Sequence, residues 1–162
     1  MATHVVVVAT LTATSSDLIA ALGARAARGP IEVTLLMPGQ GPGLSGRDAV
    51  RERLDAALAV WREAGIEAEG VAGDADPMTA VGELWDPRRH DEVIVSTLPG
   101  QSSKWIRSDL PHRVARLTGA PVLHVVAMDM RPEPTHGPPP VREKSALGPL
   151  SVLSWGGRPA DE

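Results

Sequence analysis

The 162-residue chain contains no cysteine, no phenylalanine and no tyrosine. Without cysteine there can be no disulfide, thiolate nucleophile, iron–sulfur cluster or cysteine-ligated zinc site. The four tryptophans (Trp61, Trp85, Trp105 and Trp155) are too few to build the stacking platform of a single-strand nucleic-acid binder. The formal net charge of −4 also lacks the basic footprint that DNA and RNA require, so no nucleic-acid partner is expected.

Long hydrophobic runs and catalytic motifs are absent as well. No stretch approaches the roughly 20 apolar residues of a membrane span. The start, MATHVVVVAT, has too short an apolar run for a secretory signal, so we expect a cytoplasmic protein with no membrane partner. The chain has no H-E-x-x-H motif, Walker loop or G-x-S-x-G elbow. No metal ligand or catalytic residue is therefore predicted, which favours a non-enzymatic protein and leaves an enzyme open.

The sequence is rich in alternating strand and helix patterns. Runs of aliphatic, largely β-branched residues predict five strands, at 4–9, 31–37, 66–70, 91–97 and 121–127. Apolar residues at helical spacing predict four intervening helices. Their expected N-caps are Ser15 or Ser16, Ser45, Asp74 or Asp76, and Ser108 or Asp109. This alternation predicts a doubly wound α/β domain over residues 1–127, with a five-stranded parallel sheet and helices on both faces.

Composition changes after residue 127. Residues 128–162 hold seven of the 15 prolines and form a Pro-rich C-terminal tail that cannot build a packed core alone. We expect this extension to be partly disordered or to dock. Its apolar segment 147–155 could contact its own domain or a partner.

The topology limits where a ligand could bind. In doubly wound sheets the binding crevice lies outside the carboxyl ends of the strands, where the strand order reverses. Two segments matter most under this rule: residues 10–14, after the first strand, and residues 98–107, after the fourth. The second is predicted to be a loop, followed by a helix that opens at Ser108 or Asp109.

With this order of elements, the chain resembles the universal stress protein family over about residues 4–127. The resemblance lies mainly in the closing stretch: the strand DEVIVST, a loop with Gly and Ser, the helix LPHRVARLTG and the strand APVLHVVA. It implies a regulatory protein of stress survival, with sheet order 3-2-1-4-5. It also implies a homodimer through the last strand, residues 121–127.

The ATP motif of the family is degenerate in this chain. ATP-binding members carry Gly-x-x-Gly, nine residues, then Gly-Ser/Thr, and an Asp that closes the first strand. Ser96 and Pro99 stand where the first two glycines belong, and the spacing from Pro99 to Ser108 is one residue short. Pro99 has no amide hydrogen for a phosphate, and Asp109 places a carboxylate near the helix start. Ala9 and Thr10 occupy the end of the first strand, so ATP binding in the family mode is not expected, nor is a cofactor.

One alternative reading is a nucleotide- or anion-binding protein that uses a modified loop at 100–108, with weak hydrolysis of ATP. ATP or AMP would be its ligand. The candidate binding residues are Thr10, Gly100, Ser102, Ser103, Lys104 and Ser108. Small residues, hydroxyls and cations can hold an anion. In the competing reading Ser108 and Asp109 only cap a helix and Lys104 lies on a solvated rim. Trp105 either covers this crevice or packs into a dimer contact.

Overall fold

The structure is a computed structural model that describes residues 1–40, 43–100 and 103–130. The described residues form a five-stranded, all-parallel sheet of order β3-β2-β1-β4-β5, as predicted. The strands are β1 (Thr3–Val8), β2 (Ile31–Pro38), β3 (Ala68–Gly73), β4 (Glu92–Thr97) and β5 (Val122–Val126). The central strand β1 pairs with β2 in the register Val5↔Val33 and with β4 in the register Val6↔Val93. This topology confirms the doubly wound α/β fold.

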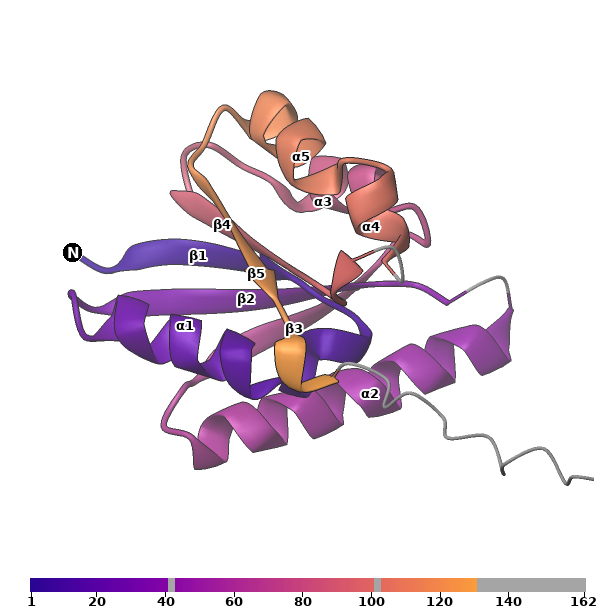
Figure 1. Ribbon diagram of the computed structural model, residues 1–162, viewed down its shortest axis with the longest axis horizontal. Helices are drawn as coiled ribbons and strands as arrows, with labels where there is room; N and C mark the ends of the chain where they lie inside the picture. The colour runs from indigo at the N-terminus through magenta and orange to yellow at the C-terminus, as the bar shows by residue number, and fades with distance from the viewer. Residues whose placement is uncertain (41–42, 101–102, 131–162) are drawn as a thin grey trace, which may run out of the picture. The chain divides into compact units, whose positions relative to one another are not determined.

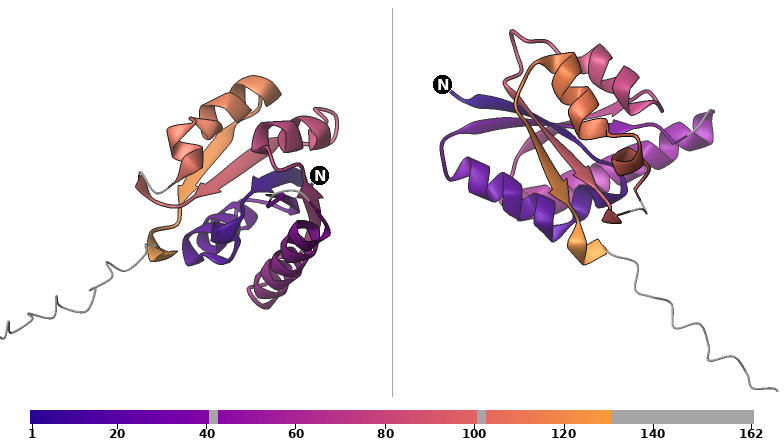
Figure 2. Two further views of the ribbon diagram at one scale, coloured as in Figure 1. Left: turned by 90° about the vertical axis from the view of Figure 1, so that its right-hand side faces the viewer. Right: turned by 45° about the horizontal axis from the view of Figure 1, so that its top comes forward.

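Helices cover both faces of the sheet (Figure 1). The helical segments are η1 (Leu11–Thr14), α1 (Ser16–Ala26), α2 (Leu44–Glu63), α3 (Pro77–Leu84), α4 (Lys104–Arg107), α5 (Leu110–Thr118) and η3 (Met128–Met130). Helices α1 and α2 pack on one face, whereas α3 and α5 pack on the other, which two further views also show (Figure 2). Across the described residues, no helix combines the length and apolarity that a membrane crossing needs.

The alternating side chains of the strands divide the core into two layers. Val5 and Val7 of β1 point toward α1 and α2, where they pack in one layer with the buried Trp61 of α2. Val6 and Val8 point the other way and pack under α3 and α5. Because residues 5–8 of β1 are buried on both faces, they form a run of four valines, the pattern that predicts a central parallel strand.

Several predicted boundaries are wrong, among them the end of the third strand, which is Gly73 and not residue 70. The third strand begins at Ala68 instead of residue 66, because Ile66 is buried and its amide donates to the carbonyl of Trp61, which keeps it with the end of α2. Helix α2 begins at Leu44, so its N-cap is Gly43 and not Ser45. The segment 98–107 is not all loop, because residues 104–107 form α4.

The last described segment is fixed to the body of the domain. The carboxylate of Asp17 accepts a hydrogen bond from the amide of Met128 at 2.7 Å, and that of Asp129 accepts from the amide of Ser16 at 2.9 Å. The predicted tail at 128–162 therefore begins with the ordered turn η3, whereas residues 131–162, including the segment 147–155, lie outside the described residues. The homodimer through β5, an edge strand of the sheet, stays a prediction.

Candidate functional site

A crevice of about 510 Å³ opens at the carboxyl edge of the sheet. It lies where β1 and β4 are neighbours and where the chain leaves them toward opposite ends of the sheet, the position expected for a ligand site. Its lining comes from the last residues of β2 and β4 and from the segments that follow β1, β2, β3 and β4: Thr10, Leu11, Thr12, Pro38, Gly39, Gln40, Ala75, Ser96, Thr97, Leu98, Ser103, Lys104 and Trp105.

Hydroxyl groups form the floor of this crevice. Ser96 and Thr97 close β4, and both are buried, with exposed fractions of 1% and 2%. The hydroxyl of Thr12 lies 2.7 Å from that of Ser96, a buried hydrogen bond that joins the first loop to β4. The hydroxyl of Thr97 is bonded to Nε2 of His124 at 2.8 Å. This part of the lining is therefore polar, and the hydrogen bonds with Thr12 and His124 fix the positions of its hydroxyls.

The first loop is held in place by a tryptophan of α2. The indole Nε1 of Trp61 donates to the carbonyl of Ala13 in η1 at 2.7 Å. Ser15, which follows η1, is the N-cap of α1: its side chain accepts a hydrogen bond from the amide of Leu18, as its sequence position predicts. Both contacts position Thr10 and Thr12, which flank the start of η1, against the crevice.

The segment after β4 turns sharply before it enters α4. Gly100 has a φ of 60°, in the left-handed region that glycine adopts without a steric penalty. The amide of Ser103 donates to the carbonyl of Gly100 at 3.2 Å, and its side chain caps α4 by accepting from the amide of Ile106. This turn places Lys104 and Trp105, the first two residues of α4, on the wall of the crevice.

The structure brings together three of the six predicted binding residues. Thr10, Ser103 and Lys104 all line the crevice. Gly100 contributes the turn but does not line the cavity, and Ser102 lies outside the described residues. Ser108 is placed elsewhere: it is exposed, forms the C-cap of α4, and donates its hydroxyl to the carbonyl of Trp105 at 3.3 Å.

Of the two residues predicted to open this helix, Ser108 is wrong, whereas the alternative, Asp109, is confirmed at the N-cap position of α5. Asp109 is the residue that precedes α5, in a left-handed conformation with a φ of 55° and with no side-chain capping bond. Its carboxylate instead pairs with Nδ1 of His112 at 2.6 Å. Neither Ser108 nor Asp109 lines the crevice, because the short helix α4 separates them from its wall.

Four lining positions carry signals that the sequence prediction missed. Thr12, Ser96 and Thr97 end or follow strands that were correctly placed, and their hydroxyls were not assigned to the site. Gln40 follows β2, and the sequence prediction considered only the segments after the first and fourth strands. Trp105 also lines the crevice, which is the covering position that was one of its two predicted alternatives.

The described lining of the crevice carries one positive charge. Among its described lining residues, Lys104 is the one ionised side chain, and none is Asp, Glu or His. The described part of the chain also holds no group of three or more His, Cys, Asp or Glu side chains that could bind a metal ion. The crevice can therefore attract an anion and hydrogen-bond to it, and its described lining holds no Asp, Glu or His.

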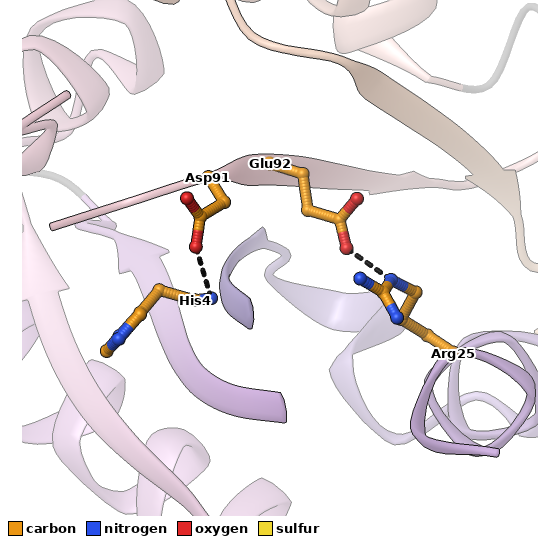
Figure 3. A network of polar contacts seen from close by, with 4 residues as sticks. All are labelled: His4, Arg25, Asp91 and Glu92. Atoms are coloured by element: carbon orange, nitrogen blue, oxygen red, sulfur yellow. Dashed lines mark hydrogen bonds and ion pairs between the residues drawn. The ribbon is translucent and has the colours of Figure 1, made fainter. Parts of the chain in front are cut away.

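Polar contacts at the opposite, amino edge of the sheet are structural (Figure 3). Arg25 of α1 pairs with the carboxylate of Glu92, and the amide of His4 donates to Asp91 at 2.8 Å. These contacts join β1, β4 and α1. The nearby His90 accepts a hydrogen bond from the amide of Asp86, and burial is the main cause that lowers its pKa. This edge is the wrong side for a ligand crevice.

Comparisons with known proteins agree with this fold. No family model and no curated protein matches the sequence. A universal stress protein structure from Archaeoglobus fulgidus has a TM-score of 0.54 and 21% identity, over 77% of this chain and 98% of the other. One from Arabidopsis thaliana with AMP bound has a TM-score of 0.54 and 15% identity, over 82% and 97%. A third, in complex with cAMP, has a TM-score of 0.53 and 22% identity, over 78% and 98%. The chain thus shares the fold of universal stress proteins.

Proposed function

We propose that this chain is a non-enzymatic regulatory protein of universal-stress-protein type that binds a nucleoside monophosphate in the crevice at the carboxyl edge of its sheet. The observation that carries the proposal is the lining itself. A single cation, Lys104, stands beside the hydroxyls of Thr10, Ser96, Thr97 and Ser103, with no acidic group among the described lining residues. One phosphate group needs these two kinds of partner, a positive charge and hydrogen-bond donors.

The size of the crevice and the solved structures support the same class of ligand. A volume of about 510 Å³ falls within the roughly 300–1,000 Å³ range of small-molecule sites. The aromatic ring of Trp105 and the apolar Leu11 and Leu98 offer surface for a base. Structures of the same fold contain AMP in one protein and cAMP in another. By analogy of fold, the crevice of this chain is suited to such a ligand.

The proposal excludes ATP held in the family mode. That mode needs glycine amides and a hydroxyl at a helix start for the triphosphate. Pro99 has no amide hydrogen, and Ser108 points its hydroxyl at the carbonyl of Trp105 instead of into the crevice. The carboxylate of Asp109 precedes α5. With Lys104 as the one cation among the described lining residues, the crevice offers charge for one phosphate better than for three.

Isothermal titration with AMP, cAMP, ADP and ATP tests the proposal. We expect AMP or cAMP to bind at least as tightly as ATP. Lys104→Ala should weaken AMP binding by about tenfold or more, since a hydrogen bond to a charged group contributes about 1.5–3 kcal/mol.

The matched control is Arg107→Ala. It removes an equal charge from the same four-residue helix, at an exposed position that does not line the crevice. Its effect on AMP binding should be less than about twofold. The proposal fails if neither monophosphate binds, or if both variants weaken binding equally, since the second result would reflect only the general field of the protein.

A further inference from the structure

The hydrogen bond between Thr97 and His124 connects the crevice to a second cavity. Thr97 Oγ1 and His124 Nε2 are 2.8 Å apart, and the two residues lie on neighbouring strands of the same sheet. Thr97 is buried and lines the crevice. His124 lines a separate cavity of about 430 Å³ between α5 and the edge strand β5. The pair therefore forms part of the wall between the two cavities.

The two residues share a face of the sheet because strand side chains alternate. Val93, Val95 and Thr97 of β4 point toward the layer of α3 and α5, as does Val122 of β5. His124 is two residues beyond Val122, and its backbone is in register with Val95. Its ring can thus reach along the same face to Thr97, and this contact is fixed by the register of the two strands.

A threonine hydroxyl can act in two ways in such a pair. If Thr97 donates its proton to Nε2, only its lone pairs are left for the crevice, and lone pairs repel an anion. If Nε2–H donates to Thr97, the proton of the hydroxyl is free to point at a ligand. The second arrangement is available to the imidazolium and to one neutral tautomer of histidine. The imidazolium adds a positive charge behind the hydroxyl.

We propose that His124 is a positioning residue for the crevice: by donating Nε2–H to Thr97, it directs the Thr97 hydroxyl at a bound phosphate group and links anion binding to its own protonation. The inference rests on the proposed function, since it names a residue outside the crevice that regulates the same site. It also gives a role to a histidine of the edge strand β5.

The surroundings of His124 leave its charge to be decided by burial and by the ligand. Partial burial lowers the pKa of His124, although the residue remains exposed on the edge strand β5. From α5, Asp109 and His112 line the same cavity, where they pair with each other at 2.6 Å. Lys104 of α4 lines the crevice on the far side of Thr97, and Arg25 and Arg28 of α1 line another cavity with Leu123. Partial burial therefore favours the neutral form of the ring in the free protein.

Anion binding in the crevice and protonation of His124 favour each other. An anion beside Thr97 stabilises the imidazolium, so the pKa of His124 is higher in the complex than in the free protein. Binding therefore takes up a proton, and affinity increases as the pH falls through the interval between the two pKa values. Each unit of difference between them corresponds to a factor of ten in affinity.

The test is the affinity for AMP at about pH 7.5 and about pH 5.2 in the wild type, His124→Gln, Thr97→Val and the double variant. Glutamine places an amide donor near the position of Nε2 but does not titrate. The phosphate of AMP itself titrates near pH 6, so variants are compared at the same pH. We expect the affinity of the wild type relative to His124→Gln to rise by about threefold or more at the lower pH. In the Thr97→Val background this difference should disappear.

Several results would overturn the inference. Identical pH dependence in the wild type and His124→Gln would do so, as would a His124 effect that persists with valine at position 97. A histidine NMR titration of the wild type gives a readout that needs no variant: saturating AMP should raise the pKa of His124, and an unchanged pKa would contradict the linkage. If the wild type binds no nucleotide at either pH, the proposed function itself fails, which is distinct from binding without proton linkage.

Discussion

Replacing Trp61 by phenylalanine tests how the crevice is supported from the core. Trp61 is fully buried, and its Nε1 donates to the carbonyl of Ala13 at 2.7 Å. Phenylalanine keeps an aromatic ring but removes the donor and part of the ring volume. A buried acceptor that loses its partner costs about 1–3 kcal/mol, and the smaller ring leaves a cavity that costs about 1–2 kcal/mol more. We therefore expect the free energy of unfolding to fall by about 2–5 kcal/mol.

Trp85→Phe is the matched control. The Nε1 of Trp85 is also buried, but it has no hydrogen-bond partner among the described residues, and the side chain is only half-buried. The same substitution there breaks no hydrogen bond and removes an unsatisfied donor. Its cost should therefore be less than about 1.5 kcal/mol, from packing alone.

The assay is urea unfolding followed by far-ultraviolet circular dichroism, because tryptophan fluorescence changes with the substitutions themselves. Both variants should keep the slope of the wild-type transition, so that the shift in midpoint reports stability. Trp61→Phe should also weaken AMP binding, since Ala13 lies in the turn next to Thr12 of the crevice. If Trp61→Phe costs no more than Trp85→Phe, the hydrogen bond to Ala13 does not support the fold as argued.

Two further predictions concern stability. Gly73→Ala should lower the free energy of unfolding by about 1–3 kcal/mol, because a Cβ there would lie 2.7 Å from the Cβ of Ala80. Gly23→Ala should raise it by about 0.5–1 kcal/mol, because Gly23 has open space around it in α1. Thermal unfolding that ranks the two variants in the opposite order would contradict the packing. The hydrogen bonds from Ser16 lower the pKa of Asp129, so Asp129→Asn should destabilise the chain at neutral pH. Because the folded pKa is depressed, this difference is present above the ordinary value of about 3.9 and is lost as the pH falls through the lower value. Urea midpoints measured across that range test this, and a difference that persists in acid would contradict it.

The sheet could be predicted because its information is local and repeated. The run HVVVVA of β1 and the aliphatic residues of β4 are buried on both faces, so their composition alone marks them as inner parallel strands. The sequence left two candidates for the cap of α1 and two for that of α3, and the structure selects Ser15 over Ser16 and Asp76 over Asp74. The order of the strands came from the resemblance, not from the pattern.

The site was less predictable because it is made by tertiary contacts. A helix of four residues, such as α4, shows no hydrophobic period, so residues 104–107 look like loop in the sequence. That helix places Ser108 at its own C-cap and turns it away from the crevice. The bond between Thr97 and His124 depends on the register of β4 and β5, which no spacing in the sequence expresses.

Binding of a nucleoside monophosphate in the crevice can be followed residue by residue. The most direct measurement is a two-dimensional amide NMR titration of the full chain with AMP. Binding in the crevice should produce saturable shifts at Thr10, Thr97, Ser103, Lys104 and Trp105, while the amides of His4, Arg25 and Asp91 at the amino edge stay unchanged. Shifts that gather at the amino edge, or no saturable shift at millimolar AMP, would contradict it.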